Sequence, residues 1–156
     1  MASILQQELK KRGPFASVEQ EAILSVLRTG ELLENRVARL LREFGLTSSQ
    51  YNVLRILRGE GKPMPCLEVA ERMIQVAPAI TRVVEQLLKL DLIDKWQCQD
   101  DRRVFYIEIK PAAQHLLKKI DQPLLDLHSA QLNNVSARDL KTLIRILESI
   151  RQQSKD

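Results

Sequence analysis

The chain has 156 residues, with 44% hydrophobic and 28% charged side chains and a formal net charge of +4. These values are those of an ordinary globular domain, and no apolar run approaches the roughly 20 residues that a membrane-spanning helix needs. The first residues also lack the apolar core of a secretory signal. We therefore expect a cytoplasmic protein with no membrane partner.

The excess of basic residues is too small to identify a partner. Between residues 46 and 110, ten Lys and Arg side chains stand against nine Asp and Glu side chains. Any argument for binding a polyanion must therefore rest on where individual charges lie, because the total charge says little.

A long helix is predicted near the start of the chain. After a polar lead-in that Gly13 and Pro14 interrupt, Ser17 and Gln20 have the spacing of a capping box. From residue 18 to residue 44 the apolar residues recur at helical spacing: Ile23, Leu27, Leu33, Val37, Leu40, Leu41 and Phe44. Helices in monomeric domains usually run for ~8–20 residues, so we expect this one to pack against something outside its own domain.

Two shorter helices are predicted next. Gly45 is placed to end the long helix, and Thr47 is placed to cap a helix over residues 48–58. Glycines and prolines then break the chain at residues 59–65, before a short helix over residues 65–73, which a proline suits as first residue. The inward side of this short helix is predicted to consist of Leu67, Val69, Ala70 and Met73.

A further helix is predicted from about Ala77-Pro78 to Leu90. Its apolar side consists of Ile80, Val83, Val84, Leu87 and Leu88. Thr81 and Arg82 lie on the other side, in the part of a recognition helix that points at base edges in the major groove. Arginine suits bidentate contact with guanine, and threonine suits contact with phosphate or the thymine methyl group. On the helix alone, a plain solvated face explains these two residues equally well.

A β-hairpin is predicted over residues 93–109. Its turn carries Asp101, Arg102 and Arg103. The second strand alternates, with one face formed by Phe105, Ile107 and Ile109. An arginine that reaches a narrow minor groove meets enhanced negative potential there, and Asp101 can fix the geometry of such an arginine by bidentate pairing.

Two more helices complete the chain. The first is predicted from Pro111 to about Leu132, with a kink at Pro123, and the second follows a capping box formed by Ser136 and Asp139. Their apolar residues are Leu116, Leu117, Ile120, Leu124, Leu125, Leu127, Leu140, Leu143, Ile144, Leu147 and Ile150. The helices at both ends have more apolar surface than the unit between them can cover, so we expect a two-fold helical dimer interface.

A helix-turn-helix followed by a hairpin is a winged helix. We therefore predict a mainly α fold, in which a winged helix-turn-helix unit at residues 46–110 is flanked by a helical dimerisation region at residues 1–45 and 111–156. A dimer would place two such units symmetrically, as reading a pseudo-palindromic DNA site requires.

Five segments, in order and at matching spacing, resemble the MarR family of dimeric winged-helix transcriptional regulators. They read LTSSQYNVLRIL (46–57), CLEVAERM (66–73), AITRVVEQL (79–87), LIDKW (92–96) and DRRVFYIEI (101–109). The resemblance implies a homodimer that binds double-stranded DNA, with a wing arginine in the minor groove. The DNA-facing residues that it implies are Pro78, Ala79, Thr81, Arg82 and Gln86 on the recognition helix and Asp101, Arg102 and Arg103 in the wing.

Four residues depart from the family pattern. Asp91 stands where the family usually has a helix-ending glycine, and aspartate adopts the left-handed conformation at some cost. Gln86 replaces a frequent arginine, which removes one phosphate contact. Lys110 and Ala113 replace a threonine and a glycine. We expect the fold to survive these changes and the affinity or site preference to differ.

The resemblance also implies a ligand site. Members of the family commonly respond to small aromatic or phenolic molecules in a crevice between the dimerisation helices and the winged unit, so we expect an effector of that kind and no other cofactor. Cys66 and Cys98 fit no metal or disulfide spacing and have no obvious neighbouring base. His115 and His128 cannot close a tetrahedral metal site by themselves.

No phosphate-binding loop, catalytic triad or other enzymatic motif is found, so we expect a protein that is not an enzyme. The sequence predicts a homodimeric, sequence-specific DNA-binding transcriptional regulator, specifically a repressor relieved by a small-molecule effector. Two alternatives stay open, a winged-helix module that docks protein without binding DNA and a thiol-based redox-sensing regulator.

Overall fold

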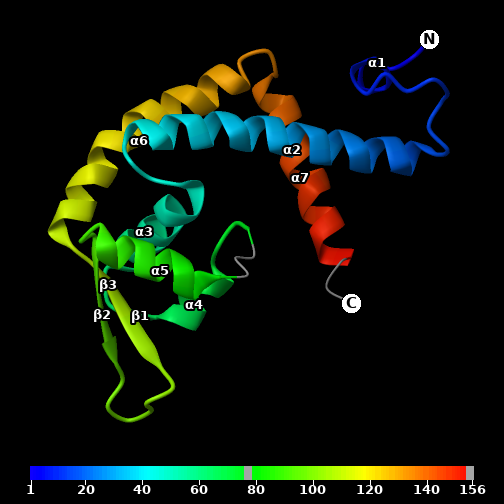
Figure 1. The fold of residues 1–156 in the computed structure, drawn as a ribbon. Coiled ribbons are helices and arrows are strands. Elements are labelled where there is room, and N and C mark those ends of the chain that lie inside the picture. Colours follow the sequence, from blue (N-terminus) through cyan, green and yellow to red (C-terminus); the bar gives the residue numbers. More distant parts are fainter. Residues whose placement is uncertain (76–78, 154–156) are drawn as a thin grey trace.

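The computed structural model describes residues 1–75 and 79–153 and has the predicted mainly α, winged-helix architecture (Figure 1). Within these residues the helices and strands are α1 (Ile4–Glu8), α2 (Val18–Glu43), α3 (Ser48–Glu60), β1 (Met64–Pro65), α4 (Cys66–Glu71), α5 (Ile80–Lys89), β2 (Ile93–Gln97), β3 (Phe105–Ile109), α6 (Pro111–Gln131) and α7 (Ala137–Gln153). Among them, no helix combines the length and the apolar character that crossing a membrane requires.

Helix α2 begins and ends as its sequence predicts. The Ser17 hydroxyl accepts a hydrogen bond from the Gln20 amide at 3.1 Å. The Gln20 side chain accepts from the Ala16 amide at 2.8 Å, one residue earlier than a regular capping box would have it. The helix stops before Gly45, whose φ of 77° is the left-handed conformation that glycine adopts without strain.

The core of the molecule lies in the winged unit. Helices α3 and α5 pack on each other and on the sheet, and the C-terminal end of α2 and the first half of α6 complete this core (Figure 1). The side chains with no measurable exposure at its centre are Leu41, Val53, Leu54, Leu57, Val69, Leu87, Ile107, Ala113, Leu117 and Ile120. Residues from both predicted regions thus share one core, which fixes the winged unit rigidly to the first half of α6.

The sheet has three strands in the order β1-β3-β2, all antiparallel. Trp96 lies opposite Tyr106 in the β2–β3 hairpin, and their rings stack with centroids 6.2 Å apart. Strand β1 was not predicted, because two residues are too few to show alternation. Pro65, predicted as the first residue of a helix, lies in this edge strand and at the N-cap of α4.

The inward side predicted for α4 is partly wrong. Leu67 is 72% exposed, whereas Val69 is fully buried. Residues two apart in an α-helix point about 200° apart around its axis, so one packed face cannot bury both. The helix also ends at Glu71, earlier than predicted. The predicted start of the next helix at Ala77-Pro78 lies outside the described residues.

Two of the departures from the family pattern meet in space. Asp91 ends α5 with a φ of 57°, the left-handed conformation expected for an aspartate in place of glycine. Its carboxylate lies 2.6 Å from the Lys110 ammonium group. This exposed ion pair ties the end of α5 to the start of α6.

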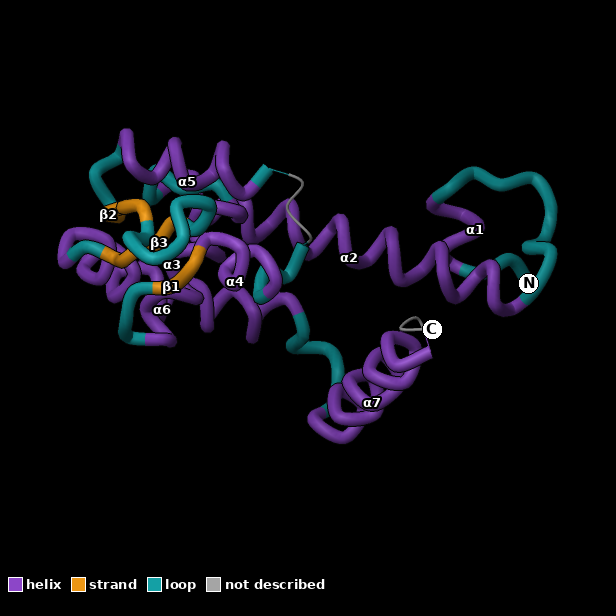
Figure 2. Tube along the Cα trace, turned by 90° about the horizontal axis from the view of Figure 1, so that it is seen from below, coloured by secondary structure: helices purple, strands orange, loops and turns teal. Residues whose placement is uncertain are grey.

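The helices at the two ends extend away from the winged unit (Figures 1 and 2). Helix α6 packs along α2, contains Pro123 and changes direction along its length in Figure 1. Helix α7 starts at a cap in which the Ser136 hydroxyl accepts from the Asp139 amide at 3.1 Å. No residue of α7 is buried in the single chain.

Candidate DNA interface

Helix α5 presents its first turn to solvent. Val83, Val84 and Leu87 anchor it in the core, and Thr81 and Arg82 are exposed on the opposite side, as predicted. Ala79, the N-cap, is exposed and makes no side-chain cap. Within the described residues no side chain caps this turn, so the amide groups at its start are available to an anion. Pro78, which completes the predicted set on this helix, lies outside the described residues.

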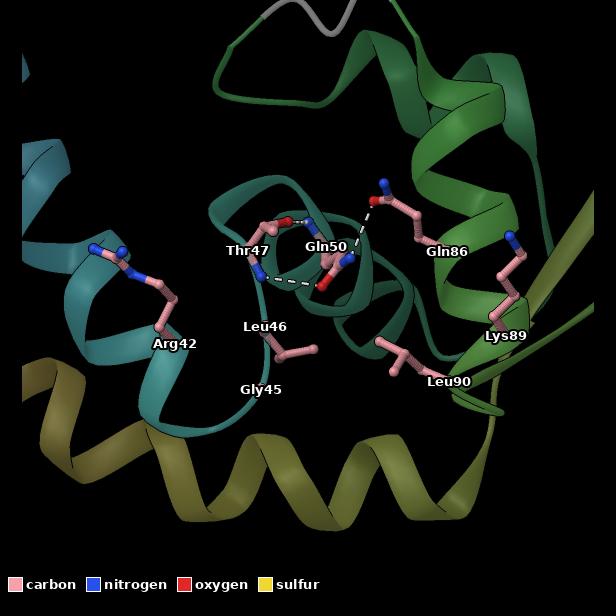
Figure 3. A pocket seen from close by; sticks show the side chains of 8 residues that line it. All are labelled: Arg42, Gly45, Leu46, Thr47, Gln50, Gln86, Lys89 and Leu90. Carbon is pink, nitrogen blue, oxygen red and sulfur yellow. Dashed lines mark hydrogen bonds between the residues drawn. The ribbon is translucent and has the colours of Figure 1, made fainter.

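Gln86 is held by a contact that the sequence did not predict (Figure 3). Its side-chain oxygen accepts a hydrogen bond from the Gln50 amide nitrogen at 3.1 Å. Gln50 is only 7% exposed, and its own oxygen accepts from the Thr47 amide at 3.0 Å in the capping box of α3. Gln86 therefore connects the recognition helix to the start of α3, and it is not free to swing toward a ligand without breaking this bond.

The tip of the wing holds one arginine in a fixed geometry. The Arg103 guanidinium donates to both carboxylate oxygens of Asp101, with its Nε 3.1 Å from Oδ1 and an Nη 3.2 Å from Oδ2. The hydrogen bonds from Arg103 hold the pKa of the Asp101 carboxyl below its usual range. The Arg103 side chain is 90% exposed. The pair thus orients a cation that faces solvent, as the sequence predicted.

Arg102 has a different role in the turn. Its backbone carbonyl accepts a hydrogen bond from the Gln97 side chain at 2.6 Å, which closes the hairpin. Its guanidinium is exposed and pairs with no acidic group among the residues described. The turn therefore carries one restrained and one unrestrained arginine.

A cavity of about 310 Å³ joins the helix and the wing. Thr81 and Arg103, predicted from separate elements, both line it, together with Cys66, Lys95 and Phe105. Burial raises the pKa of the Cys66 thiol, and nearby Lys95 opposes that shift only in part. A thiol with a raised pKa carries less thiolate at neutral pH, so the structure weighs against Cys66 as a redox sensor.

A second cavity, of about 250 Å³, lies where α2, α3 and α6 meet. Its walls combine Val37, Leu41 and Leu124 with the polar side chains of Ser48, Tyr51, Asn52, Arg55 and His128. The Ser48 hydroxyl is buried and has no hydrogen-bond partner in the parts of the chain described. Burial also raises the pKa of the Tyr51 phenol. A neighbouring cavity of about 430 Å³ shares several of these residues and extends along α2.

The two histidines lie at different places on α6. His128 lines the second cavity, and His115 lies exposed on the first turns of α6. In residues 1–75 and 79–153, no three His, Cys, Asp or Glu side chains are grouped as a metal ion would require.

Known transcriptional regulators resemble this chain. The model of the MarR family matches residues 46–105. The HTH-type transcriptional regulator YwoH of Bacillus subtilis is 30% identical over 95 residues, which cover 61% of this chain and 69% of YwoH. A MarR transcription factor from Planctomyces limnophilus is 33% identical with a TM-score of 0.67, covering 86% of this chain and 98% of that one.

A third similarity concerns the fold alone. The organohalide-sensing regulator RdhR, in its form bound to 2,4-dichlorophenol, superposes with a TM-score of 0.81 at 16% identity, covering 92% of this chain and 87% of that one. The winged unit, the matched family model and the relatives at 30% identity or more all indicate the same family. The chain belongs to the MarR family of DNA-binding transcriptional regulators, whose members are not enzymes.

Proposed function

We propose that the protein is a homodimeric, sequence-specific repressor in the cytoplasm. In this proposal Thr81 and Arg82 read base edges in the major groove, and Arg103 enters the adjacent minor groove. The observation that carries it is that Thr81 and Arg103, from a helix and a hairpin, converge on one cavity while their polar groups face solvent. A helix flanked by a wing in this way matches a duplex, whose major groove admits a helix beside the narrower minor groove.

The end helices support the dimer. Val18, Ile23 and Leu27 on α2 are 80%, 60% and 63% exposed in the single chain. On α7, Leu143 and Ile144 are 45% and 55% exposed. Apolar residues at this spacing and exposure are typical of a helical interface between subunits.

Charge placement on the same helices fits pairing between copies. The first turn of α2 carries Glu19 and Glu21, while α7 carries Arg138, Lys141 and Arg145 in its first half. Contacts between α2 of one copy and α7 of the other would bring these opposite charges together, beside the apolar residues. We propose residues 1–45 and 111–156 as the dimerisation region on this basis, with residues 46–110 as the DNA-binding unit.

The cavity between α2, α3 and α6 is proposed as the effector site. An engineered apolar cavity of about 150 Å³ holds benzene, so about 250 Å³ has room for one substituted ring. The buried Ser48 hydroxyl, without a described partner, would donate to or accept from a phenol or aromatic acid. That RdhR binds 2,4-dichlorophenol in a similar fold supports this class of ligand.

The same cavity offers a route to the recognition helix. Its lining includes Met73, Ile74 and Gln75, which follow α4 and precede α5 in the chain. A ligand that displaces this segment would change the position of α5. The effector would relieve repression if the ligand-bound conformation of the dimer binds the operator more weakly than the ligand-free conformation.

Two measurements on the wild-type chain test the dimer and the DNA. Sedimentation equilibrium at micromolar concentration should give the mass of two chains. Selection of bound fragments from the source genome, followed by fluorescence anisotropy, should give a site bound at least ~10³-fold tighter than random duplex. A monomer, or equal affinity for selected and random duplexes, would refute the proposal.

The effector is tested with 2,4-dichlorophenol and benzoate as probes. A probe that binds should raise the melting temperature and release the selected duplex, and Ser48→Ala should weaken both effects. Ser129→Ala, an equivalent change on the exposed side of α6, is the control and should behave like the wild type. If no probe shifts the melting temperature, the effector part fails while DNA binding stands.

A further inference from the structure

An open cavity on the far side of α5 from the wing carries two cations from different elements. It has a volume of about 540 Å³, and Figure 3 shows Arg42, at the end of α2, on one side and Lys89, near the end of α5, on the other. Thr47 and Gln50 lie between them. Neither cation pairs with an acidic group among the described residues, whereas Arg58, Arg72 and Lys110 all do.

Helical geometry places this cavity and the wing on different sides of α5. Thr81 lines the cavity beside the wing, and Gln86 lines the cavity with the two cations. Residues five apart in an α-helix point about 140° apart around its axis. The outward face of α5 between these two sides carries Arg82, Glu85 and Lys89, all exposed.

A helix in a major groove has a sugar-phosphate strand on each side. The wing accounts for the strand on one side of α5. We infer that the strand on the other side crosses the cavity at the α2–α3 corner, where Arg42 and Lys89 each contact a backbone phosphate. This inference rests on the proposed DNA binding and adds to it a contact from the dimerisation region.

The two cations contact different phosphates, because they lie on opposite sides of the cavity with Thr47 and Gln50 between them (Figure 3). The first turn of α3 begins between them, and the positive end of its dipole adds to the attraction. Arg42 belongs to α2, and α2 also lines the proposed effector cavity through Val37 and Leu41. A ligand that shifts α2 would therefore displace a DNA contact directly.

The inference is tested by the salt dependence of binding to the selected duplex. Each phosphate contact contributes about 0.9 to the slope of log K against log salt concentration. Each substitution is present in both subunits of the dimer, so Arg42→Gln and Lys89→Gln should each reduce the magnitude of the slope by about 1.8, and the double variant by about 3.6. The preference for the selected site over random duplex should stay the same, because phosphate contacts carry no sequence information. Arg42→Lys should keep the wild-type slope.

A matched control separates local contact from total charge. Lys118→Gln removes the same charge from the exposed side of α6, at a residue that neither lines this cavity nor belongs to the α2 and α7 contacts proposed for the dimer. It should leave the slope unchanged. Duplexes that carry a single neutral methylphosphonate group at different positions then locate the contacts. A substitution at the phosphate that Arg42 contacts should lower the affinity of the wild type and leave the affinity of Arg42→Gln unchanged.

Two outcomes are distinct. If the wild type binds its site with a steep salt slope and Arg42→Gln has the same slope and affinity, this inference is wrong and the proposed function stands. If the wild type itself shows neither site preference nor salt slope, the proposed function fails, and this inference fails with it.

Discussion

Restoring the family's arginine at residue 86 should trade stability for DNA affinity. In this chain the Gln86 side-chain oxygen accepts the hydrogen bond from Gln50, whose side chain is 7% exposed. An arginine has no acceptor, so Gln86→Arg leaves the Gln50 amide nitrogen without its partner. The new guanidinium would lie at the cavity where we infer a phosphate strand.

The two effects have separate magnitudes. Leaving a buried donor unpaired costs about 1–3 kcal/mol, and the low end applies because the cavity is open to water. For a chain of this size, 1 kcal/mol lowers the melting temperature by about 2–4 °C. One added phosphate contact in each subunit of the dimer should steepen the salt slope by about 1.8 and tighten binding at low salt.

Differential scanning calorimetry and anisotropy titrations at several salt concentrations measure both effects. Gln86→Ala is the control, because it also removes the acceptor and adds no charge. It should be destabilised to a similar extent and show no gain in affinity. If Gln86→Arg has the melting temperature and salt slope of the wild type, then the Gln50 hydrogen bond does not stabilise the fold and no phosphate lies at this cavity.

Four further outcomes follow from the structure. Arg82→Ala should relax base preference, with a loss of about 1–3 kcal/mol of discrimination at one base pair, measured by anisotropy on single-site variants of the selected duplex. Arg103→Ala should weaken binding to selected and random duplexes alike and lower the salt slope, since the minor groove carries little sequence information. Because Arg103 lowers the folded-state pKa of Asp101, the ion pair should persist as the pH falls below the usual aspartate range and break only as the pH passes through the lowered pKa. Carboxyl NMR titration should show a higher Asp101 pKa in Arg103→Ala than in the wild type. Iodoacetamide should alkylate Cys66 more slowly than a free cysteine at pH 7, and mild peroxide should leave DNA binding of the wild type unchanged.

Local signals in the sequence predicted most of the elements. Ser17 and Thr47 cap helices where their positions before apolar runs indicate, and Gly45 ends α2 in the left-handed conformation. The alternation of the second wing strand places Ile107 in the core. These features depend on residues that are close together in the chain, so they can be predicted from the sequence alone.

Contacts between distant residues were not predictable. Gln50 and Gln86 are 36 residues apart, and nothing in either segment marks the other as its partner. Asp91 and Lys110 were each recognised only as a departure from the family pattern, and the structure shows that they pair. Pairing of this kind depends on how α5 and α6 pack, which periodicity does not specify.

The role of Arg42 was also missed. Arg42 reads in the sequence as one more charge on a long helix, and only the fold brings it to the same cavity as Lys89. Leu67 shows the opposite failure, since its helical spacing indicated burial and its side chain is 72% exposed. In a helix of six residues there is too little periodicity to fix the buried face.

The spacing between half-sites tests the central claim most directly. A rigid dimer should hold its two winged units on one face of the duplex, with half-sites one helical turn or a whole number of turns apart. Inserting about five base pairs, half a turn, at the centre of the selected site should reduce the affinity to that of a duplex with one half-site. Unchanged affinity after the insertion would mean that the chain does not read DNA as a dimer with fixed geometry.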